Sequence, residues 1–185
     1  TEVLVENADI VLTDMEKQQD KIEVLDLCCG SGCIGISLKL YHKQIGLSLL
    51  DISEDALAVT RRNLDQYGLD ATVQQGNLLE NITDEYDMIV SNPPYIESHV
   101  IGTLMPEVRE YEPMLALDGG EDGLMFYRSI IQQAVSHLRE HGWLFFEIGY
   151  NQGDTVAALM KEHGFSEVQV VKDYAGLDRV VYGHL

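Results

Sequence analysis

Short runs of apolar residues alternate along this chain with longer segments in which apolar residues recur every three or four positions. The runs predict strands buried in a sheet, and the recurrences predict helices with one buried face. Alternating strands and helices form a mostly parallel sheet with helices on both faces, and the last two runs are close enough in sequence to pair antiparallel. The expected strands are residues 22–27, 44–51, 71–75, 86–91, 143–148, 165–171 and 179–183.

Three helices are expected in the first half of the chain. The first spans Glu2 to about Lys17, and the second follows a glycine-rich turn and reaches about Tyr41. Ser53 is expected to cap the start of the third, because its side chain suits an N-cap, and Gly68 is expected to end it. Apolar spacing predicts that the third helix has one face made by Leu57, Thr60, Leu64 and Tyr67.

Two His–Gly pairs, at 141–142 and 163–164, are expected to end two later helices, because a basic residue followed by glycine is a common C-terminal cap. Residues 94–121 have no clean periodicity, and such a segment is expected to be a lid, a binding loop or disordered. The helix expected before 141–142 has one face made by Leu124, Tyr127, Ile131, Ala134 and Leu138.

The charge of the chain indicates which classes of partner it is expected to bind. The 185 residues suit one domain, with 31 Asp and Glu against 12 Lys and Arg and a formal net charge of -19. Nucleic-acid-binding proteins usually present a basic face, so no direct nucleic-acid binding is expected. No apolar run approaches the ~20 residues that cross a bilayer, and no export signal opens the chain. A cytoplasmic protein with no membrane partner is therefore expected.

The three cysteines, Cys28, Cys29 and Cys33, lie within six residues of one another. A structural zinc site has two spaced ligand pairs, and a disulfide framework spreads its cysteines along the chain. Neither pattern is present, so no metal is expected. The cysteines are interpreted as small apolar residues that line a tight loop in a reducing compartment.

That loop carries a nucleotide-binding pattern. Residues 30–35 match G-x-G-x-x-G, and Asp51 ends the next strand, where a carboxylate can accept hydrogen bonds from a ribose. Asp26, at the end of the preceding strand, favours S-adenosylmethionine, because a carboxylate suits an ammonium and a sulfonium better than a pyrophosphate. A dinucleotide site and a simple strand-to-helix turn remain open. Asn77 and Leu78 are expected to face an adenine, although a turn after Gly76 explains them equally well.

Asn92-Pro93-Pro94-Tyr95 follows the fourth expected strand, at the edge where open α/β sheets bind ligands. A rigid turn is the alternative explanation. An amide nitrogen is a poor nucleophile, and two acceptors, the Asn92 side-chain oxygen and the Pro93 carbonyl, suit its two hydrogens. Tyr95 can stack on the planar group and accommodate positive charge over its ring. The segment therefore predicts transfer of a methyl group to a planar nitrogen by positioning and electrostatics, without a general base.

The chain resembles the PrmC/HemK family, the protein-(glutamine-N5) methyltransferases that modify the Gly-Gly-Gln motif of peptide chain release factors. Asn-Pro-Pro-Tyr alone is shared with adenine-N6 methyltransferases, whereas the downstream motifs are more specific to the glutamine enzymes. The motifs that carry the resemblance are Thr1-Glu2, Leu4 to Glu6, Asp26 to Gly32, Asp51, Ser91 to Ile96, Glu112-Pro113, Ala116-Leu117, Gly119 to Leu124, Tyr127-Arg128, Glu147 to Gly149, Gln152, Asp173-Tyr174, Gly176 and Arg179.

The resemblance implies a Rossmann-like class I fold, with a seven-stranded sheet whose last strand is antiparallel. It implies that S-adenosylmethionine is the methyl donor, with S-adenosylhomocysteine as product, and that a release factor is the protein substrate. It implies that Asn92, Pro93, Pro94 and Tyr95 bind the substrate amide. The residues that it implies for the cofactor are Cys28, Cys29, Gly30, Ser31, Gly32, Asp51, Ile52, Asn77, Leu78 and Asn92.

Three departures from the family pattern qualify these expectations. Cys28 stands where the family often has glycine, and Asn77 where it commonly has aspartate. The resemblance also implies that residues 1–185 are the catalytic domain alone, without the N-terminal helical domain that helps to dock the release factor. An adenine-N6 methyltransferase of DNA or RNA and a dinucleotide-binding module remain the alternatives. Within the loop, Tyr111 is a candidate substrate contact, whereas Glu107, Arg109 and Glu112 are expected to be solvated or turn residues.

Overall fold

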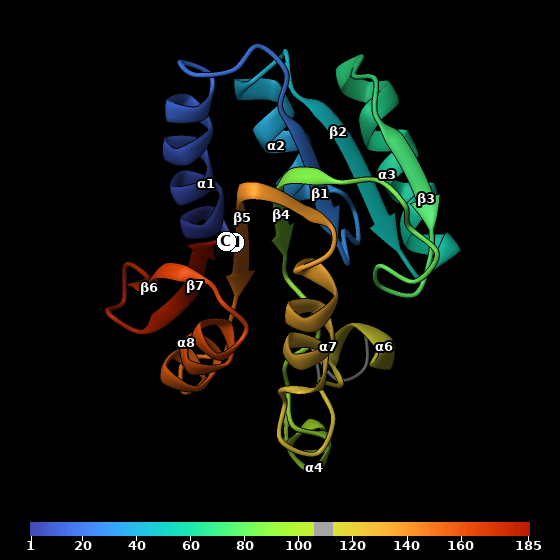
Figure 1. The fold of residues 1–185 in the computed structure, drawn as a ribbon. Helices are drawn as coiled ribbons and strands as arrows, with labels where there is room; N and C mark the ends of the chain where they lie inside the picture. Colours follow the sequence, from blue (N-terminus) through green and yellow to red (C-terminus); the bar gives the residue numbers. More distant parts are fainter. Residues whose placement is uncertain (106–112) are drawn as a thin grey trace.

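The structure, a computed structural model, describes residues 1–105 and 113–185. Within these residues the strands form one seven-stranded sheet in the order β3-β2-β1-β4-β5-β7-β6 (Figure 1). Neighbouring strands from β3 to β5 are parallel, and β7 runs antiparallel to both β5 and β6, which confirms the expected sheet. The strands are β1 (Glu23–Leu27), β2 (Gly46–Asp51), β3 (Thr72–Gln75), β4 (Tyr86–Ser91), β5 (Leu138–Glu147), β6 (Ser166–Lys172) and β7 (Asp178–His184).

Helices cover both faces of the sheet, as the alternation of elements predicts (Figure 1). Helices α1, α2 and α3 pack on one face, and α7 and α8 on the other. No helix among the described residues is long and apolar enough to cross a membrane. The helices are α1 (Glu2–Met15), α2 (Cys33–Tyr41), α3 (Glu54–Tyr67), α4 (Ser98–Ile101), α6 (Met114–Leu117), α7 (Met125–Ala134) and α8 (Gly153–Glu162).

The central strands are apolar on both sides because each face of the sheet has its own core. Along β4, Met88 and Val90 face the core under α1 to α3, whereas Ile89 faces the core under α7 and α8. The same alternation places Phe145 in the first core and Phe146 in the second. A strand buried on both faces is a continuous run of apolar residues in the sequence. These strands could therefore be predicted from the sequence.

The capping residues behave as expected at α3 and α8. The Ser53 hydroxyl accepts a hydrogen bond from the Ala56 N–H at 3.3 Å, and Gly68 ends α3 in the left-handed conformation. His163 caps α8, and its Nδ1 lies 2.8 Å from the Leu159 carbonyl oxygen. Tyr67 differs from the prediction, because it is 54% exposed and lies outside the buried face of its helix.

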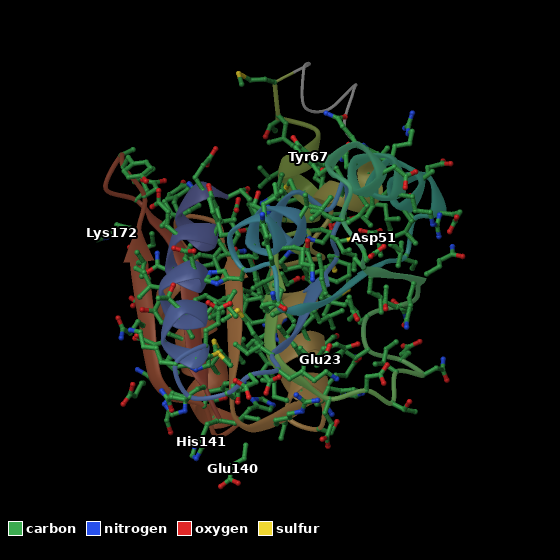
Figure 2. All side chains as sticks on the ribbon, turned by 90° about the horizontal axis from the view of Figure 1, so that it is seen from above. Glu23, Asp51, Tyr67, Glu140, His141 and Lys172 are labelled. Carbon is green, nitrogen blue, oxygen red and sulfur yellow. The ribbon has the colours of Figure 1, made fainter. Side chains whose placement is uncertain are left out.

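The prediction that a helix ends at residues 141–142 is wrong. Helix α7 ends at Ala134, and Leu138, expected on the same helical face, begins β5. His141 has a φ of 65° and lies where the pairing of β5 with β4 shifts register. It points away from the body of the molecule together with Glu140 (Figure 2). In a helix C-cap the glycine is the left-handed residue, whereas in this strand irregularity His141 is left-handed and Gly142 is not.

In the described parts of the segment after β4, residues 98–101 and 114–117 form the single-turn helices α4 and α6. The two ends of this segment meet in a short parallel bridge between Ile96 and Asp118. The Ile96 N–H donates to the Leu117 carbonyl at 3.0 Å, and the Gly119 N–H donates to the Ile96 carbonyl at 2.8 Å. The predictions for Glu107, Arg109, Tyr111 and Glu112 lie outside the described residues.

Candidate functional site

Four loops meet at the carboxyl edge of the parallel strands. They follow β1, β2, β3 and β4, and they contain the glycine loop, Asp51, Asn77-Leu78 and the Asn92 to Tyr95 segment. The chain leaves β1 toward β2 and β3 and returns to β4 on the other side of β1. Open α/β sheets bind their ligands at such a reversal of strand order. The fold thus brings the predicted loops together.

The glycine loop is held in a shape that ordinary residues rarely adopt. Gly30 and Gly32 have φ values of 56° and 78°, and Cys28 adopts 58° although it has a side chain. A Cβ added to Gly32 would lie 3.0 Å from the side chains of Leu49 and Thr60. The Thr60 hydroxyl also donates to the Gly30 carbonyl at 2.8 Å. The third position of the loop therefore requires glycine because the chain packs tightly there.

Asp51 ties the second strand to this loop. Its Oδ2 accepts the Gly30 N–H at 2.8 Å, and its Oδ1 accepts the Ser53 N–H at 2.9 Å. Both carboxylate oxygens keep lone pairs for a ligand, since each oxygen has about two acceptor positions. Asp51 lines the first of the two pockets described below. It is therefore a fixed acceptor at the rim of a cavity.

Asp26 is placed differently from the expected ligand contact. Its side chain is fully buried, Oδ2 accepts the Gly35 N–H at 2.8 Å, and Oδ1 has no hydrogen-bond partner among the described residues. Burial raises the pKa of the Asp26 carboxyl to about 7, although the bond from Gly35 opposes the shift. Asp26 lines neither pocket, so its direct contact with a ligand stays a prediction, and its observed contact is with the start of α2.

The first pocket is a mainly apolar slot between the loops after β2 and β3 and the two elements α6 and α7. It contains six residues that were expected from the sequence to bind cofactor or substrate: Cys28, Asp51, Ile52, Asn77, Leu78 and Pro94. The opposite wall of the slot was not predicted from the sequence. The segment after β4 has no periodic pattern that would indicate that this segment folds back over the slot. The residues that complete the slot are Leu50, Ser53, Ala56, Gly76, Pro113, Leu115, Ala116 and Phe126.

The second pocket adjoins the first and lies over β1 and β4. The two pockets share Cys28, Pro94 and Ala116 in their linings. Gly32 lines neither pocket and acts through the loop conformation. The lining of the second pocket is Cys28, Cys29, Gly30, Ser31, Cys33, Ile34, Asn92, Pro93, Pro94, Tyr95, Ile96, Ala116 and Leu117.

Within the second pocket, Pro93 and Pro94 are buried, whereas Asn92 and Tyr95 are partly exposed. Among residues 1–105 and 113–185, no group forms a hydrogen bond with the Asn92 carboxamide. Burial and the nearby Glu147 carboxylate raise the pKa of Tyr95, and the Arg179 guanidinium partly opposes this shift. The Tyr95 phenol is therefore neutral at physiological pH, and its ring remains a π surface without a phenolate charge.

The cysteines are neutral thiols in this site. Burial, together with the Asp51 carboxylate, raises the pKa of Cys28 to about 12. Burial also raises the pKa of Cys29, whose sulfur lies 3.9 Å from the Thr60 hydroxyl, and that of Cys33. In the part of the chain that the structure describes, no group of three or more His, Cys, Asp or Glu is placed to hold a metal ion. The cysteines thus act as loop-lining side chains, as expected.

Comparison with solved structures establishes the fold. A methyltransferase from Pyrococcus furiosus superposes with a TM-score of 0.67 at 15% identity, over 95% of this chain and 82% of that one. Residues 4–107 match the family described as the methyltransferase small domain. This match, the strand order and the bond from Gly30 to Asp51 define a class I S-adenosylmethionine-dependent methyltransferase fold.

Two further relatives identify the family. A protein of Geobacter sulfurreducens named release factor glutamine methyltransferase is 42% identical over 188 residues, which is 100% of this chain and 63% of that protein. A release factor-specific protein-(glutamine-N5) methyltransferase of Alicyclobacillus acidocaldarius is 30% identical with a TM-score of 0.60, over 99% of this chain and 90% of that structure. The chain belongs to the family of release factor glutamine methyltransferases. It spans less than two thirds of the length of the Geobacter relative.

The residues present fit S-adenosylmethionine, the methyl donor that this family implies. The apolar slot suits an adenine ring, and Asp51 supplies fixed acceptors at its rim for two ribose hydroxyls. A Cβ added to Gly30 would meet no atom within 4 Å, so a ligand can approach the backbone there. The Asp51 carboxylate in the lining of the slot favours a ligand that carries positive charge.

Proposed function

We propose that this protein transfers a methyl group from S-adenosylmethionine to the side-chain amide nitrogen of a glutamine in a peptide chain release factor. One observation carries the proposal: the pocket lined by Asn92, Pro93 and Tyr95 adjoins the slot lined by Asp51, and the two share Cys28, Pro94 and Ala116. A methyl donor in the slot and a planar amide in the second pocket would meet at the residues shared by both.

In this proposal the first pocket binds the adenosyl part of the donor. Asp51 accepts hydrogen bonds from the two ribose hydroxyls while its bonds to Gly30 and Ser53 keep the carboxylate in place. Leu78 and Phe126 lie in the lining of the slot and offer apolar surface to the adenine. Asn77 is already bonded through Nδ2 to the Glu80 carboxylate at 2.9 Å, which leaves its side-chain oxygen for the adenine amino group.

The second pocket then aligns the acceptor. When bound, S-adenosylmethionine supplies an electrophilic methyl group on a sulfonium. The Asn92 side-chain oxygen and the Pro93 carbonyl accept the two amide hydrogens, which favours positive charge on the nitrogen and directs its lone pair to the methyl carbon. The rigid prolines fix these acceptors before the substrate arrives. Tyr95 stacks on the planar amide and accommodates the developing charge over its ring.

Positioning and electrostatics carry this catalysis, without a general base before methyl transfer. The described lining of the second pocket contains no carboxylate, histidine or lysine, and its thiols have raised pKa values. The proton on nitrogen becomes acidic only after the methyl group has arrived, so it can leave to solvent afterwards. Holding two reactants in register can supply roughly 7–11 kcal/mol of the barrier reduction.

The choice of a glutamine over a nucleobase rests on charge and on the relatives. A nucleic-acid methyltransferase needs basic surface beside its site, and the chain has a net charge of -19. The relatives from Geobacter sulfurreducens and Alicyclobacillus acidocaldarius are both named for glutamine methylation of release factors. The same assignment implies a cytoplasmic location, because release factors act on ribosomes. These points favour glutamine over adenine-N6 as the acceptor.

The direct test is transfer of labelled methyl from S-adenosylmethionine to purified release factor. A release factor with its Gly-Gly-Gln glutamine changed to alanine is the control. We expect incorporation into the unchanged factor and none into the control. Because this chain spans 63% of the Geobacter relative, a Gly-Gly-Gln peptide at saturating concentration is tested in parallel to separate docking from chemistry. Labelling that persists in the control factor would refute the assigned acceptor.

A further inference from the structure

Three glycines from two distant parts of the chain enclose Tyr95. A Cβ added to Gly119 would lie 2.8 Å from the Tyr95 carbonyl carbon and Cα, and one added to Gly123 would lie 2.5 Å from the Tyr95 carbonyl oxygen. A Cβ on Gly149, beyond the end of β5, would lie 3.4 Å from Tyr95 Cδ2. Side chains at Gly119 and Gly123 would displace the Tyr95 backbone. The position of Tyr95 therefore depends on glycine at both residues.

Gln152 connects these pieces. Its Nε2 donates to the Tyr95 carbonyl and to the Gly123 carbonyl, both at 3.1 Å, and its Oε1 accepts the Gly149 N–H at 2.9 Å. Gln152 is 7% exposed. Both amide hydrogens and the oxygen are therefore bonded within the protein, which fixes the side chain in one orientation. We call the set Gly119, Gly123, Gly149 and Gln152 the Tyr95 cradle.

Two further side chains, Tyr127 and Arg179, hold the backbone that carries the cradle. The Tyr127 hydroxyl, which is fully buried, donates to the Glu147 carbonyl at 2.9 Å and lies 3.4 Å from Gln152 Oε1. Arg179 donates through Nη1 to the Ile148 carbonyl at 3.0 Å. The backbone at the end of β5 is thus held by a side chain from α7 and another from β7. A backbone that is held in this way positions the groups bonded to it precisely.

We propose that Gln152 and the cradle glycines are positioning residues that set the location of Tyr95 in the acceptor pocket. The inference rests on the proposed function, because Tyr95 is there the residue that stacks on the substrate amide. Gln152 lines neither pocket and acts on the reaction only through Tyr95. The proposal also gives a structural role to two motifs that lie far from Tyr95 in the sequence, Gly119 to Leu124 and Glu147 to Gly149.

The first test replaces Gln152 with methionine, which has similar length and no hydrogen-bonding amide. We expect kcat to fall about 10-fold to 100-fold, because small displacements of a positioning group cost that much. The dissociation constant of S-adenosylmethionine should change by less than about threefold, since Gln152 lines neither pocket. Gln133→Met is the matched control: Gln133 accepts the Leu79 N–H at 3.0 Å, away from Tyr95, and its loss should leave kcat at saturating cofactor within about threefold.

A second readout does not depend on activity. In protein with isotope-labelled tyrosine rings, with Tyr95→Phe used to assign the signal, the Tyr95 resonance should shift in Gln152→Met and not in Gln133→Met. If Gln152→Met fails to fold, Gly149→Ala takes its place, because the added Cβ would lie 2.9 Å from Gln152 Oε1. An unchanged kcat or an unmoved Tyr95 signal in the folded variant would overturn the inference. If the wild-type protein methylates no glutamine while the Tyr95 signal still shifts, the proposed function fails and the cradle stands.

Discussion

The Asp51 carboxylate accepts a hydrogen bond from the Gly30 backbone N–H at 2.8 Å, so the acid that ends β2 and the loop that follows β1 form one unit. The same carboxylate accepts the Ser53 N–H at 2.9 Å, which also orients the start of α3. Asp51 is thus oriented before any ligand binds. A ligand that uses this carboxylate need not spend binding free energy on ordering it.

Asp51→Asn tests this role. The amide keeps one oxygen but replaces the other with a donor, which cannot accept the Gly30 N–H or a ribose hydroxyl. We expect the dissociation constant of S-adenosylmethionine to rise at least about 10-fold, since hydrogen bonds to a charged group contribute roughly 1.5–3 kcal/mol. Asp122→Asn is the control: Asp122 also accepts a backbone N–H two residues ahead, from Leu124 at 3.1 Å, but lines neither pocket. Calorimetric titration measures both, and equal affinities in the two variants would contradict the role of Asp51.

The variant Phe126→Ala tests the wall of the slot to which α7 contributes, which was not predicted from the sequence. Phe126 lies on α7 and lines the first pocket, so Phe126→Ala should remove apolar surface from the adenine. Contact between a base and an aromatic ring contributes roughly 1–3 kcal/mol, which predicts a dissociation constant raised about 5-fold to 100-fold. Met125→Ala is the matched control. Met125 is the neighbour of Phe126 in the sequence, but its side chain is 47% exposed and does not line the slot. Wild-type affinity in Phe126→Ala would exclude the ring from the site.

Asn92→Ala tests the amide acceptors. The variant loses the oxygen proposed to bind one amide hydrogen, and it retains the Pro93 carbonyl and both rigid prolines. We expect kcat to fall about 100-fold or more, as when one oriented group is removed from a transition-state site. The dissociation constant of S-adenosylmethionine should rise only modestly, because Asn92 lines the second pocket and not the slot. Single-turnover kinetics and a binding titration separate the two effects, and unchanged turnover would remove the amide-acceptor mechanism.

The buried Asp26 predicts a pH dependence of stability. Burial raises its pKa to about 7 in the folded protein, whereas an unfolded aspartate titrates near about 4. Between these values the folded state holds a proton that the unfolded chain has released. The contribution of Asp26 to the free energy of unfolding is therefore fully present below about pH 4 and is lost as the pH rises through about 7.

Asp26→Asn isolates this contribution, because asparagine keeps an acceptor for the Gly35 N–H and has no proton to lose. We expect the variant to gain stability relative to wild type as the pH is raised from about 5 to about 8. Urea unfolding of both proteins at these two pH values measures the difference. Parallel pH dependences would show that Asp26 does not titrate in this range.

The sheet and the first half of the site could be predicted from the sequence because their signals are local. A strand buried on both faces is a continuous apolar run, as in residues 86–91, and its carboxyl end locates the loop that follows. Asp51 follows the same rule at the end of β2. Adjacent β1 and β4 then bring the glycine loop and Asn92 together without any further information.

The parts that the sequence did not reveal depend on contacts between distant segments. Ala116 lines the slot from a segment whose ends meet at the bridge between Ile96 and Asp118, and Phe126 lines it from α7. The His–Gly pair at 141–142 predicted a helix end, but it lies at an irregularity of β5, where His141 and not Gly142 is left-handed. The residues of the Tyr95 cradle lie 24 to 57 positions after Tyr95 in the sequence, and no local pattern records such proximity.

The central claim is that the methyl group arrives on the side-chain nitrogen of a glutamine. Fragment mass spectrometry of a Gly-Gly-Gln peptide, after incubation with the protein and S-adenosylmethionine, locates the methyl group directly. We predict one methyl group on the glutamine side-chain amide, and none when Asn92→Ala replaces the wild-type protein over the same time. A methyl group on another residue of the peptide, or transfer to an adenine in nucleic acid with none to the peptide, would contradict the account.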